Sequence, residues 1–288
     1  MSTDPLRLLL VHAHPDDESL WTGGTIASYA AAGVQVTVVT CTLGEEGEII
    51  QPELGQLGAW AGDQLGGYRV GELRAACAAL GVAEHRFLGG IGRWRDSGMA
   101  GTASAEHPRA FVAGDLAEQA GQLAEIFAEV RPQVVIGYDS FGGYGHPDHI
   151  RAHEVTMAAA EGNADIARVF YGVLSKGATE RGLAQLAATP EVPYRVPALS
   201  ELSVTEDAEI TTVVQIAEVL PAKLRALHAH ATQVNVWDSA QGRCYALSNQ
   251  LAQPIVDAEY YVLASGPAEG AETDLFGGLD GSATAGAR

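Results

Sequence analysis

The feature that most constrains the fold is a series of continuous apolar runs that alternate with helical patterns. Two of these runs, 34–42 (VQVTVVTCT) and 133–138 (QVVIGY), carry apolar and β-branched residues at almost every position. A strand that is apolar on both faces must be buried on both, as in a parallel sheet covered by helices. The alternation therefore predicts an α/β fold with a mostly parallel sheet and helices on both faces.

The remaining elements follow the same rhythm along the chain. Strands are expected at 6–12, 34–42, 85–88, 133–138, 168–174, 209–215 and 258–263. Helices are expected at 23–32, 72–81, 115–132, 149–161 and 221–232. From 265 to 288 Gly, Ala and acidic residues dominate, which predicts a loosely ordered tail.

Charge and cysteine usage narrow the classes of function. The 288-residue chain has a formal net charge of −19, and a field of that sign repels nucleic-acid phosphates and anionic membrane surfaces. No segment is long and apolar enough for a bilayer, and the N-terminal apolar run lacks the basic flank of a signal peptide. Three cysteines without a C-x-x-C pair are typical of a reduced protein. We expect a cytoplasmic protein that binds neither nucleic acid nor membranes; the sequence does not indicate its oligomeric state.

Two polar clusters directly follow predicted strands. The first, HAHPDDE, occupies 12–18, and the second, GGYGHPDH, occupies 142–149. Ligands of open parallel sheets bind beyond the carboxyl ends of the strands, so both clusters are expected at one edge of the sheet. Crowded carboxylates repel one another unless a cation lies among them. The clusters therefore predict a metal site.

The spacing within these clusters suggests how the metal is held. His14 and Asp17 are three residues apart, so one turn can direct both side chains at one point. One imidazole, from His146 or His149, would complete the three protein ligands that hydrolytic zinc sites use. Asp16 is left free beside a ligand, where a carboxylate can act as a general base.

Several alternatives stay open at this point. His149 and His153 have the i, i+4 spacing of a helical metal pair, although His153 is expected on the outer or packing face of its helix. Sites built from His and carboxylates also accept Fe²⁺. A nucleotide-binding protein without hydrolytic activity is disfavoured, because the first strand is followed by HAHPDD and not by G-x-G-x-x-G.

The two clusters together resemble the LmbE-like family of zinc N-deacetylases. The segments VVTCTLGEEGE (38–48), DQLGGYRVGEL (63–73), GRWRDSGM (92–99) and ALSNQLAQPI (246–255) resemble the members that act in mycothiol biosynthesis. The likeness covers nearly the whole chain. It implies a Rossmann-like fold and one Zn²⁺ per chain. It also implies hydrolysis of the acetamide of a small N-acetylated sugar-inositol, N-acetylglucosaminyl-inositol, to the free amine and acetate.

The resemblance also implies roles for individual residues. The implied zinc ligands are His14, Asp17 and His149. The implied catalytic groups are a general base and two residues that polarise the amide carbonyl and stabilise the oxyanion, namely Asp16, Tyr144 and His146. The residues implied to bind sugar and inositol hydroxyls or to line the pocket are Arg69, Asp96, Glu48 and Met99.

The same family leaves a choice of substrate and implies a division of the chain. An amidase that cleaves mycothiol S-conjugates is similar in its metal motif but carries a Lys soon after HPDDES. ESLWTGG (18–24) has no Lys, which favours the deacetylase; another N-acetylsugar deacetylase is a further alternative. Residues 1–165 are expected to form the Rossmann-like metal-binding core, and 166–264 a smaller C-terminal part that completes the fold and the pocket.

Overall fold

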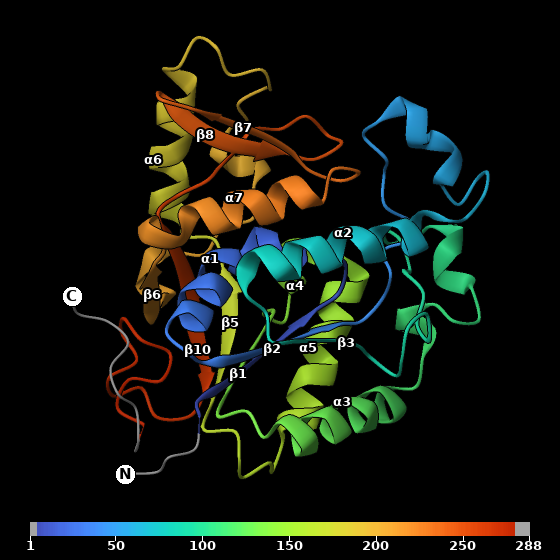
Figure 1. The fold of residues 1–288 in the computed structure, drawn as a ribbon, viewed down its shortest axis with the longest axis vertical. Coiled ribbons are helices and arrows are strands. Elements are labelled where there is room, and N and C mark those ends of the chain that lie inside the picture. Colours follow the sequence, from blue (N-terminus) through green and yellow to red (C-terminus); the bar gives the residue numbers. More distant parts are fainter. Residues whose placement is uncertain (1–4, 280–288) are drawn as a thin grey trace.

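A seven-stranded sheet in the order β3-β2-β1-β4-β5-β10-β6 forms the centre of the protein (Figure 1). The computed structural model describes residues 5–279. The strands of this sheet are β1 (Arg7–His12), β2 (Gln35–Thr40), β3 (Glu84–Phe87), β4 (Val134–Gly137), β5 (Arg168–Val173), β6 (Thr212–Gln215) and β10 (Ala258–Ser265). Strands β1 to β5 pair in parallel, and β10 runs antiparallel to both β5 and β6. The prediction of a mostly parallel sheet is confirmed.

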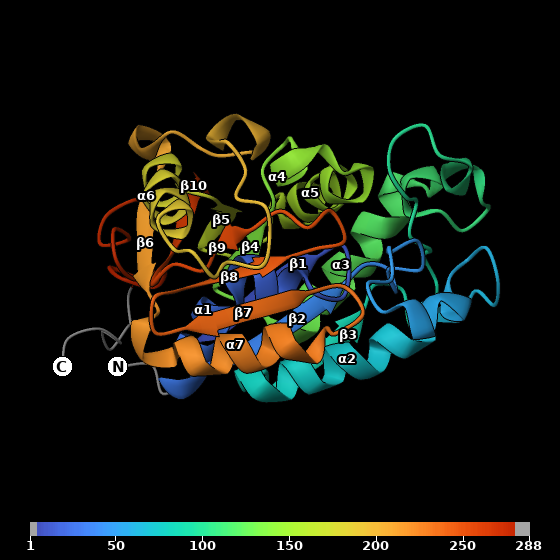
Figure 2. The same cartoon turned by 90° about the horizontal axis from the view of Figure 1, so that it is seen from above.

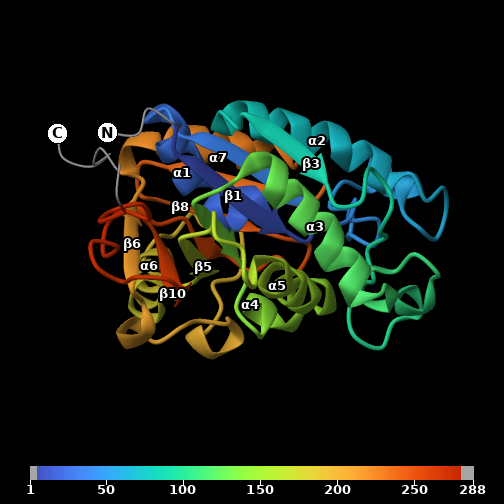
Figure 3. The same ribbon diagram turned by 90° about the horizontal axis from the view of Figure 1, so that it is seen from below.

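Helices cover both faces of the sheet (Figure 3). One face carries α1 (Asp17–Ala31), α2 (Leu65–Leu80) and α7 (Leu220–Ala229), and the other carries α3 (Leu116–Val130) and α5 (Pro147–Ala160). Each face has its own apolar cluster, because successive strand residues point to opposite sides. In β1, Leu8 and Leu10 belong to one cluster and Leu9 and Val11 to the other, and all four are fully buried. The continuous apolar run thus reflects burial on both faces.

The structure contains several elements that the sequence did not predict. A second, antiparallel sheet consists of β7 (Asn235–Ser239), β8 (Gly242–Ala246) and β9 (Gln253–Pro254). Helix α6 (Lys176–Ala187) packs against β8 and β9. A single turn, α4 (Gly142–Gly145), precedes α5. Figure 2, seen from above, shows the β7–β8 hairpin in front of β1 and β2.

Two helices begin earlier than the sequence predicted. Helix α1 begins at Asp17 instead of residue 23, and α2 begins at Leu65 instead of residue 72. The Gly23–Gly24 pair concealed the start of α1, because glycine disfavours helices. A Cβ on Gly24 would lie 2.5 Å from Ile216, so this glycine allows α1 to pack closely beside β6. The earlier start places Asp17 and Glu18 in the first helical turn, where the helix dipole favours acidic residues.

The segment 265–279 corrects the prediction of a loose tail. Leu275 and Phe276 are buried in the same apolar cluster as Leu8 and Leu10. The Tyr29 hydroxyl donates to Asp274 at 2.8 Å and fixes the segment to α1. The rest of the predicted tail, 280–288, lies outside the described residues.

A buried arginine holds this segment in place. Arg168 is fully buried and donates to the carbonyl oxygens of Pro267 at 2.7 Å, Glu269 at 2.7 Å and Leu275 at 2.9 Å. A buried guanidinium is costly unless its donors are paired, and here they satisfy carbonyls of an irregular loop. The Gly-rich composition concealed this packing, since the partners are backbone atoms.

None of the helices within 5–279 is long and apolar enough to cross a bilayer.

We predict that Phe276→Ala lowers the free energy of unfolding by about 3–5 kcal/mol, the usual cost of truncating a buried phenylalanine. Urea denaturation followed by circular dichroism measures the effect. Phe141→Ala is the matched control, because Phe141 is 57% exposed and should cost within about 0.5 kcal/mol. Equal costs for the two variants would mean that 265–279 is not part of the core.

Candidate metal and catalytic site

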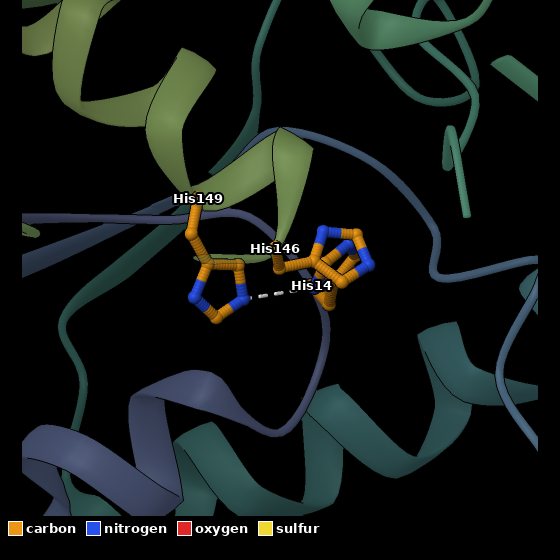
Figure 4. Close-up of side chains that lie close together, drawn as sticks. All are labelled: His14, His146 and His149. Carbon is orange, nitrogen blue, oxygen red and sulfur yellow. Dashed lines mark hydrogen bonds between the residues drawn. The ribbon is translucent and has the colours of Figure 1, made fainter. Parts of the chain in front are cut away.

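The two polar clusters meet between β1 and β4. The sheet order places β2 and β3 on one side of β1, and β4 and β5 on the other. Such a switch in direction opens a crevice at the carboxyl ends of the two strands. His14 follows β1, whereas His146 and His149 lie at the start of α5, which follows β4. Figure 4 shows the three imidazoles gathered at this point, as the sequence predicted.

Three side-chain atoms form a nearly equilateral triangle. Nδ1 of His14 lies 3.3 Å from Nε2 of His149 and 3.5 Å from Oδ2 of Asp17, and the last two atoms are 3.3 Å apart. Ligands about 2.0–2.1 Å from a tetrahedral ion lie about 3.3 Å from one another. The donor set and its spacing therefore fit one divalent cation.

The outward nitrogen of each of these two histidines has an acceptor. Nδ1 of His149 lies 3.1 Å from the carbonyl oxygen of Gly142, and Nε2 of His14 lies 3.3 Å from Oδ2 of Asp148. Such partners orient metal-binding imidazoles and fix their tautomers. Gly142 has a φ of 67°, and a Cβ there would lie 2.6 Å from Cβ of His149. Only glycine allows this close approach, which explains one glycine of the FGGYG segment.

Buried carboxylates surround His14. Burial alone would lower the pKa of His14, but Asp96, Asp148 and Asp17 together raise it well above its usual value. Burial alone would raise the pKa of Asp17, but His149 and His14 lower it well below its usual range. Among the described residues, two other groups of three could also hold a cation: His14 with His146 and His149, and His14 with Asp96 and Asp148 on the Nε2 side of the imidazole. This excess of negative charge is the environment that a cation would neutralise.

His146 is close to the triangle, but one of its nitrogens is already occupied. His146 is the N-cap of α5, and its Nδ1 accepts the backbone N–H of Asp148 at 3.1 Å. Its neutral ring therefore carries its hydrogen on Nε2. Burial, together with the neighbouring His14 and His149, lowers the pKa of His146 to about 3. His153 belongs neither to the triangle nor to the other two possible ligand groups of the described residues, and its Nδ1 lies 2.9 Å from the carbonyl oxygen of Tyr138.

Asp16 lies beside the triangle in an unusual backbone conformation. Its φ is 123°, a range that favours glycine. Its Oδ2 lies 3.1 Å from Nη2 of Arg69. Burial raises the pKa of Asp16 to about 6, although Arg69 opposes the shift.

A cavity of about 590 Å³ opens over these groups, and all of the predicted site residues except His149 line it. His149 is fully buried behind it. Tyr144 and Met99 are half exposed at the cavity, at 47% and 51%, and Glu48 also lines it. The ring of Tyr144 lies 4.9 Å from that of His149, centroid to centroid.

Two predicted substrate-binding residues are engaged within the protein. Arg69 is 2% exposed and donates to the carbonyl oxygens of Gly44 and Pro15, besides its ion pair with Asp16. Asp96 accepts the backbone N–H groups of Gly98 at 2.8 Å and Glu46 at 3.2 Å. Contact with sugar hydroxyls stays a prediction for both residues.

Sequence reasoning missed two parts of the site. Asp148 is fully buried between His14 and the backbone N–H of Ser97, 3.0 Å away, and its Oδ1 has no hydrogen-bond partner among the described residues. Its place between His146 and His149 in HPDH was the available signal. The second part is the stretch of the cavity lining that contains Asn249, between β8 and β9, and Gln253, the first residue of β9. Those two belong to ALSNQLAQPI, a segment that carried the family likeness but no assigned role.

Comparison with known proteins identifies the family of this chain. The family described as PIG-L, GlcNAc-PI de-N-acetylase, matches residues 9–160, more than half of the chain. The chain belongs to this family. The predicted LmbE-like membership is thereby confirmed. A relative from Actinosynnema mirum, named 1D-myo-inositol 2-acetamido-2-deoxy-alpha-D-glucopyranoside deacetylase, is 67% identical over 97% of this chain and 99% of its own length.

Solved structures show the same fold at low identity. The N,N'-diacetylchitobiose deacetylase from Pyrococcus horikoshii superposes with a TM-score of 0.52 at 19% identity, over 80% of this chain and 71% of that one. The 4-carboxy-2-hydroxymuconate hydratase GalB from Pseudomonas putida KT2440 gives a TM-score of 0.55 at 20% identity, over 91% and 97%. A deacetylase and a hydratase thus share this fold, so the fold alone does not define the reaction.

We predict that His149→Ala weakens zinc binding by more than about 100-fold, because it removes one of the three proposed ligands. Loss of a residue that only hydrogen-bonds to a ligand typically costs roughly 10–100-fold in metal affinity. Isothermal titration with zinc after chelation measures the affinity. His153→Ala is the matched control, since His153 is on the same helix but outside the triangle. Equal losses of zinc affinity in the two variants would favour the helical pair, and unchanged affinity in His149→Ala would contradict the triangle.

Proposed function

We propose that this protein is a metal-dependent N-deacetylase that hydrolyses the acetamide of 1D-myo-inositol 2-acetamido-2-deoxy-alpha-D-glucopyranoside. One observation carries the proposal: the His14–Asp17–His149 triangle, with Asp16 beside it, faces a cavity large enough for a sugar-inositol. The 67% identical relative of that name matches this chain over almost its full length. The products are the free amine and acetate, which fits a step in mycothiol biosynthesis.

In this proposal His14, Asp17 and His149 hold Zn²⁺, and Fe²⁺ suits the same donor set. When bound, such a cation lowers the pKa of a coordinated water to about 7 and polarises a carbonyl oxygen. The three residues supply two neutral nitrogens and one carboxylate, a combination that leaves a net positive centre. A cytoplasmic location fits the three cysteines, which are free and buried.

Asp16 acts as the general base. Its pKa of about 6 leaves most of the carboxylate ionised at neutral pH, yet makes it basic enough to accept a proton from the attacking water. The ion pair with Arg69 holds Oδ2 and leaves Oδ1 for that proton. Arg69 therefore acts by orienting Asp16, which differs from the sugar-binding role implied by resemblance.

His146 and Tyr144 stabilise the oxyanion. Since Nδ1 of His146 accepts a backbone N–H, Nε2 carries the hydrogen and can donate to the developing negative charge. The same bond disfavours an imidazolium, so His146 is a poor source of a proton. Asp16, protonated in the first step, then returns its proton to the departing amine. Tyr144, half exposed at the cavity, supplies a second hydroxyl donor.

The apolar part of the cavity lining favours a second candidate activity. Leu20, Trp21, Leu174, Leu202 and Leu247 form an apolar side of the cavity that a sugar-inositol does not need. An apolar wall suits a larger acyl group, as in a mycothiol S-conjugate. The absence of a Lys in ESLWTGG favours the deacetylase as the main activity.

We predict that the purified protein releases acetate from N-acetylglucosaminyl-inositol, that a chelator abolishes the release, and that added zinc restores it. Fluorescent labelling of the free amine measures the product. The value of kcat/KM should be higher for this substrate than for a mycothiol S-conjugate. The reverse order would make the amidase the main function, and turnover of neither substrate would exclude both.

We predict that Asp16→Asn lowers kcat by roughly 10²–10⁴-fold, the usual contribution of a general base, while the protein still binds zinc. Steady-state kinetics and metal analysis of the same preparation test this. Asp257→Asn is the control, because Asp257 is 65% exposed and does not line the cavity. Full turnover by zinc-loaded Asp16→Asn would contradict the assignment of the base.

A further inference from the structure

The backbone of Asp16 needs an external restraint. A non-glycine residue with a φ of 123° is strained, and such a conformation persists only where its surroundings determine it. Asp16 has no side-chain hydrogen bond of the kind that usually caps a helix, although it is the N-cap of α1. What fixes its conformation therefore has to come from other residues.

Glu18 supplies the first restraint. Its Oε2 accepts the backbone N–H of Asp16 at 3.0 Å, while the Asp16 carbonyl accepts the N–H groups of Ser19 and Leu20, both at 2.9 Å. Both sides of the strained residue are thus bonded to the first turn of α1. The Ser19 hydroxyl donates to the other carboxylate oxygen of Glu18, Oε1, at 2.5 Å.

His230 supplies the second restraint, from the far end of the sequence. Its Nε2 lies 2.7 Å from Oε1 of Glu18, and both side chains are fully buried. Nδ1 of His230 has no hydrogen-bond partner among the described residues. Glu18 is therefore the side chain to which the His230 ring is hydrogen-bonded. His230 ends α7, and its carbonyl accepts the N–H groups of Gln233 and Val234 at 3.0 and 2.8 Å. Its backbone is therefore fixed independently of the site.

This arrangement is a chain of contacts from α7 to the proposed base. Helix α7 packs against α1 and α2. Asp16 is the N-cap of α1, and Arg69 lies within α2. Arg69 holds the side chain of Asp16 from α2, and His230 holds its backbone from α7 through Glu18. The two restraints act on different atoms of the same residue.

We infer that His230 and Glu18 are positioning residues that hold Asp16 in its strained conformation and so aim its carboxylate into the cavity. The kinetic part of this inference rests on the proposed deacetylase function; the conformational part does not. Neither residue lines the cavity, so neither touches the substrate.

The first test is structural and needs no substrate. His230→Leu removes the donor to Glu18, and His230→Gln keeps one. Crystal structures of wild type and both variants should show Asp16 with positive φ in wild type and His230→Gln, and with relaxed φ and a displaced carboxylate in His230→Leu. An unchanged Asp16 in His230→Leu overturns the inference. If His230→Leu does not fold, Glu18→Met breaks the same link from the other side, with the same two outcomes.

The second test separates positioning from general stability. His230→Leu should lower kcat on the acetylated sugar-inositol by roughly 100-fold, the cost of a small misplacement of a reacting group, with KM and bound zinc unchanged. In an Asp16→Asn background the same substitution should change kcat by less than about 2-fold, because the group it positions is already lost. Equal losses in both backgrounds, or loss of zinc, would contradict the inference.

A matched control completes the design. His85→Leu removes a histidine that bonds Thr40 at 3.0 Å from the edge strand β3, outside the cavity, and should leave kcat within about 2-fold of wild type. Wild-type protein that is inactive on the sugar-inositol would refute the proposed function, whereas the crystal structures would still decide the positioning claim.

Discussion

The concentration of buried negative charge around one imidazole is the constraint on which the site depends. Asp17, Asp96 and Asp148 all approach His14 within 3.6 Å, and each is at least 95% buried. Buried carboxylates are costly unless they are paired and hydrogen-bonded. The protein meets part of this cost with backbone N–H groups and histidine nitrogens. The spacing of the triangle fits a cation that would offset the remaining negative charge. Binding of that cation would also stabilise the fold around His14.

Much of the fold could be predicted from the sequence because the strands are buried on both faces. Continuous runs such as QVVIGY identify central strands directly, and the carboxyl-end rule then places HAHPDDE beside GGYGHPDH. The positions of His14, Asp17 and His149 follow from that rule together with the family likeness. These inferences work because each depends on local pattern or on general sheet topology.

The parts that could not be predicted depend on long-range contacts. The link from His230 to Glu18 spans 212 positions, and the loop held by Arg168 is bound through carbonyl oxygens that every residue possesses. The family likeness implied that Arg69 binds sugar hydroxyls, and the sequence did not indicate that α2 begins early enough to bury this side chain beside Asp16. The Gly23–Gly24 pair concealed the start of α1, because helix propensity counts glycine as unfavourable. Propensity contains no information about Ile216, which packs directly beside Gly24.

The position of β10 in the sheet affects the order in which the protein can form. Strand β6 joins the sheet only through β10, although some forty residues, including the whole β7–β9 unit, separate the two along the chain. During synthesis β6 thus emerges without a neighbour to pair with and exposes an unpaired edge until Ala258–Ser265 has left the ribosome. Completion of this side of the sheet is therefore a late event, and a chain that ended before Ala258 would leave β6 without a partner and one edge of β5 unpaired.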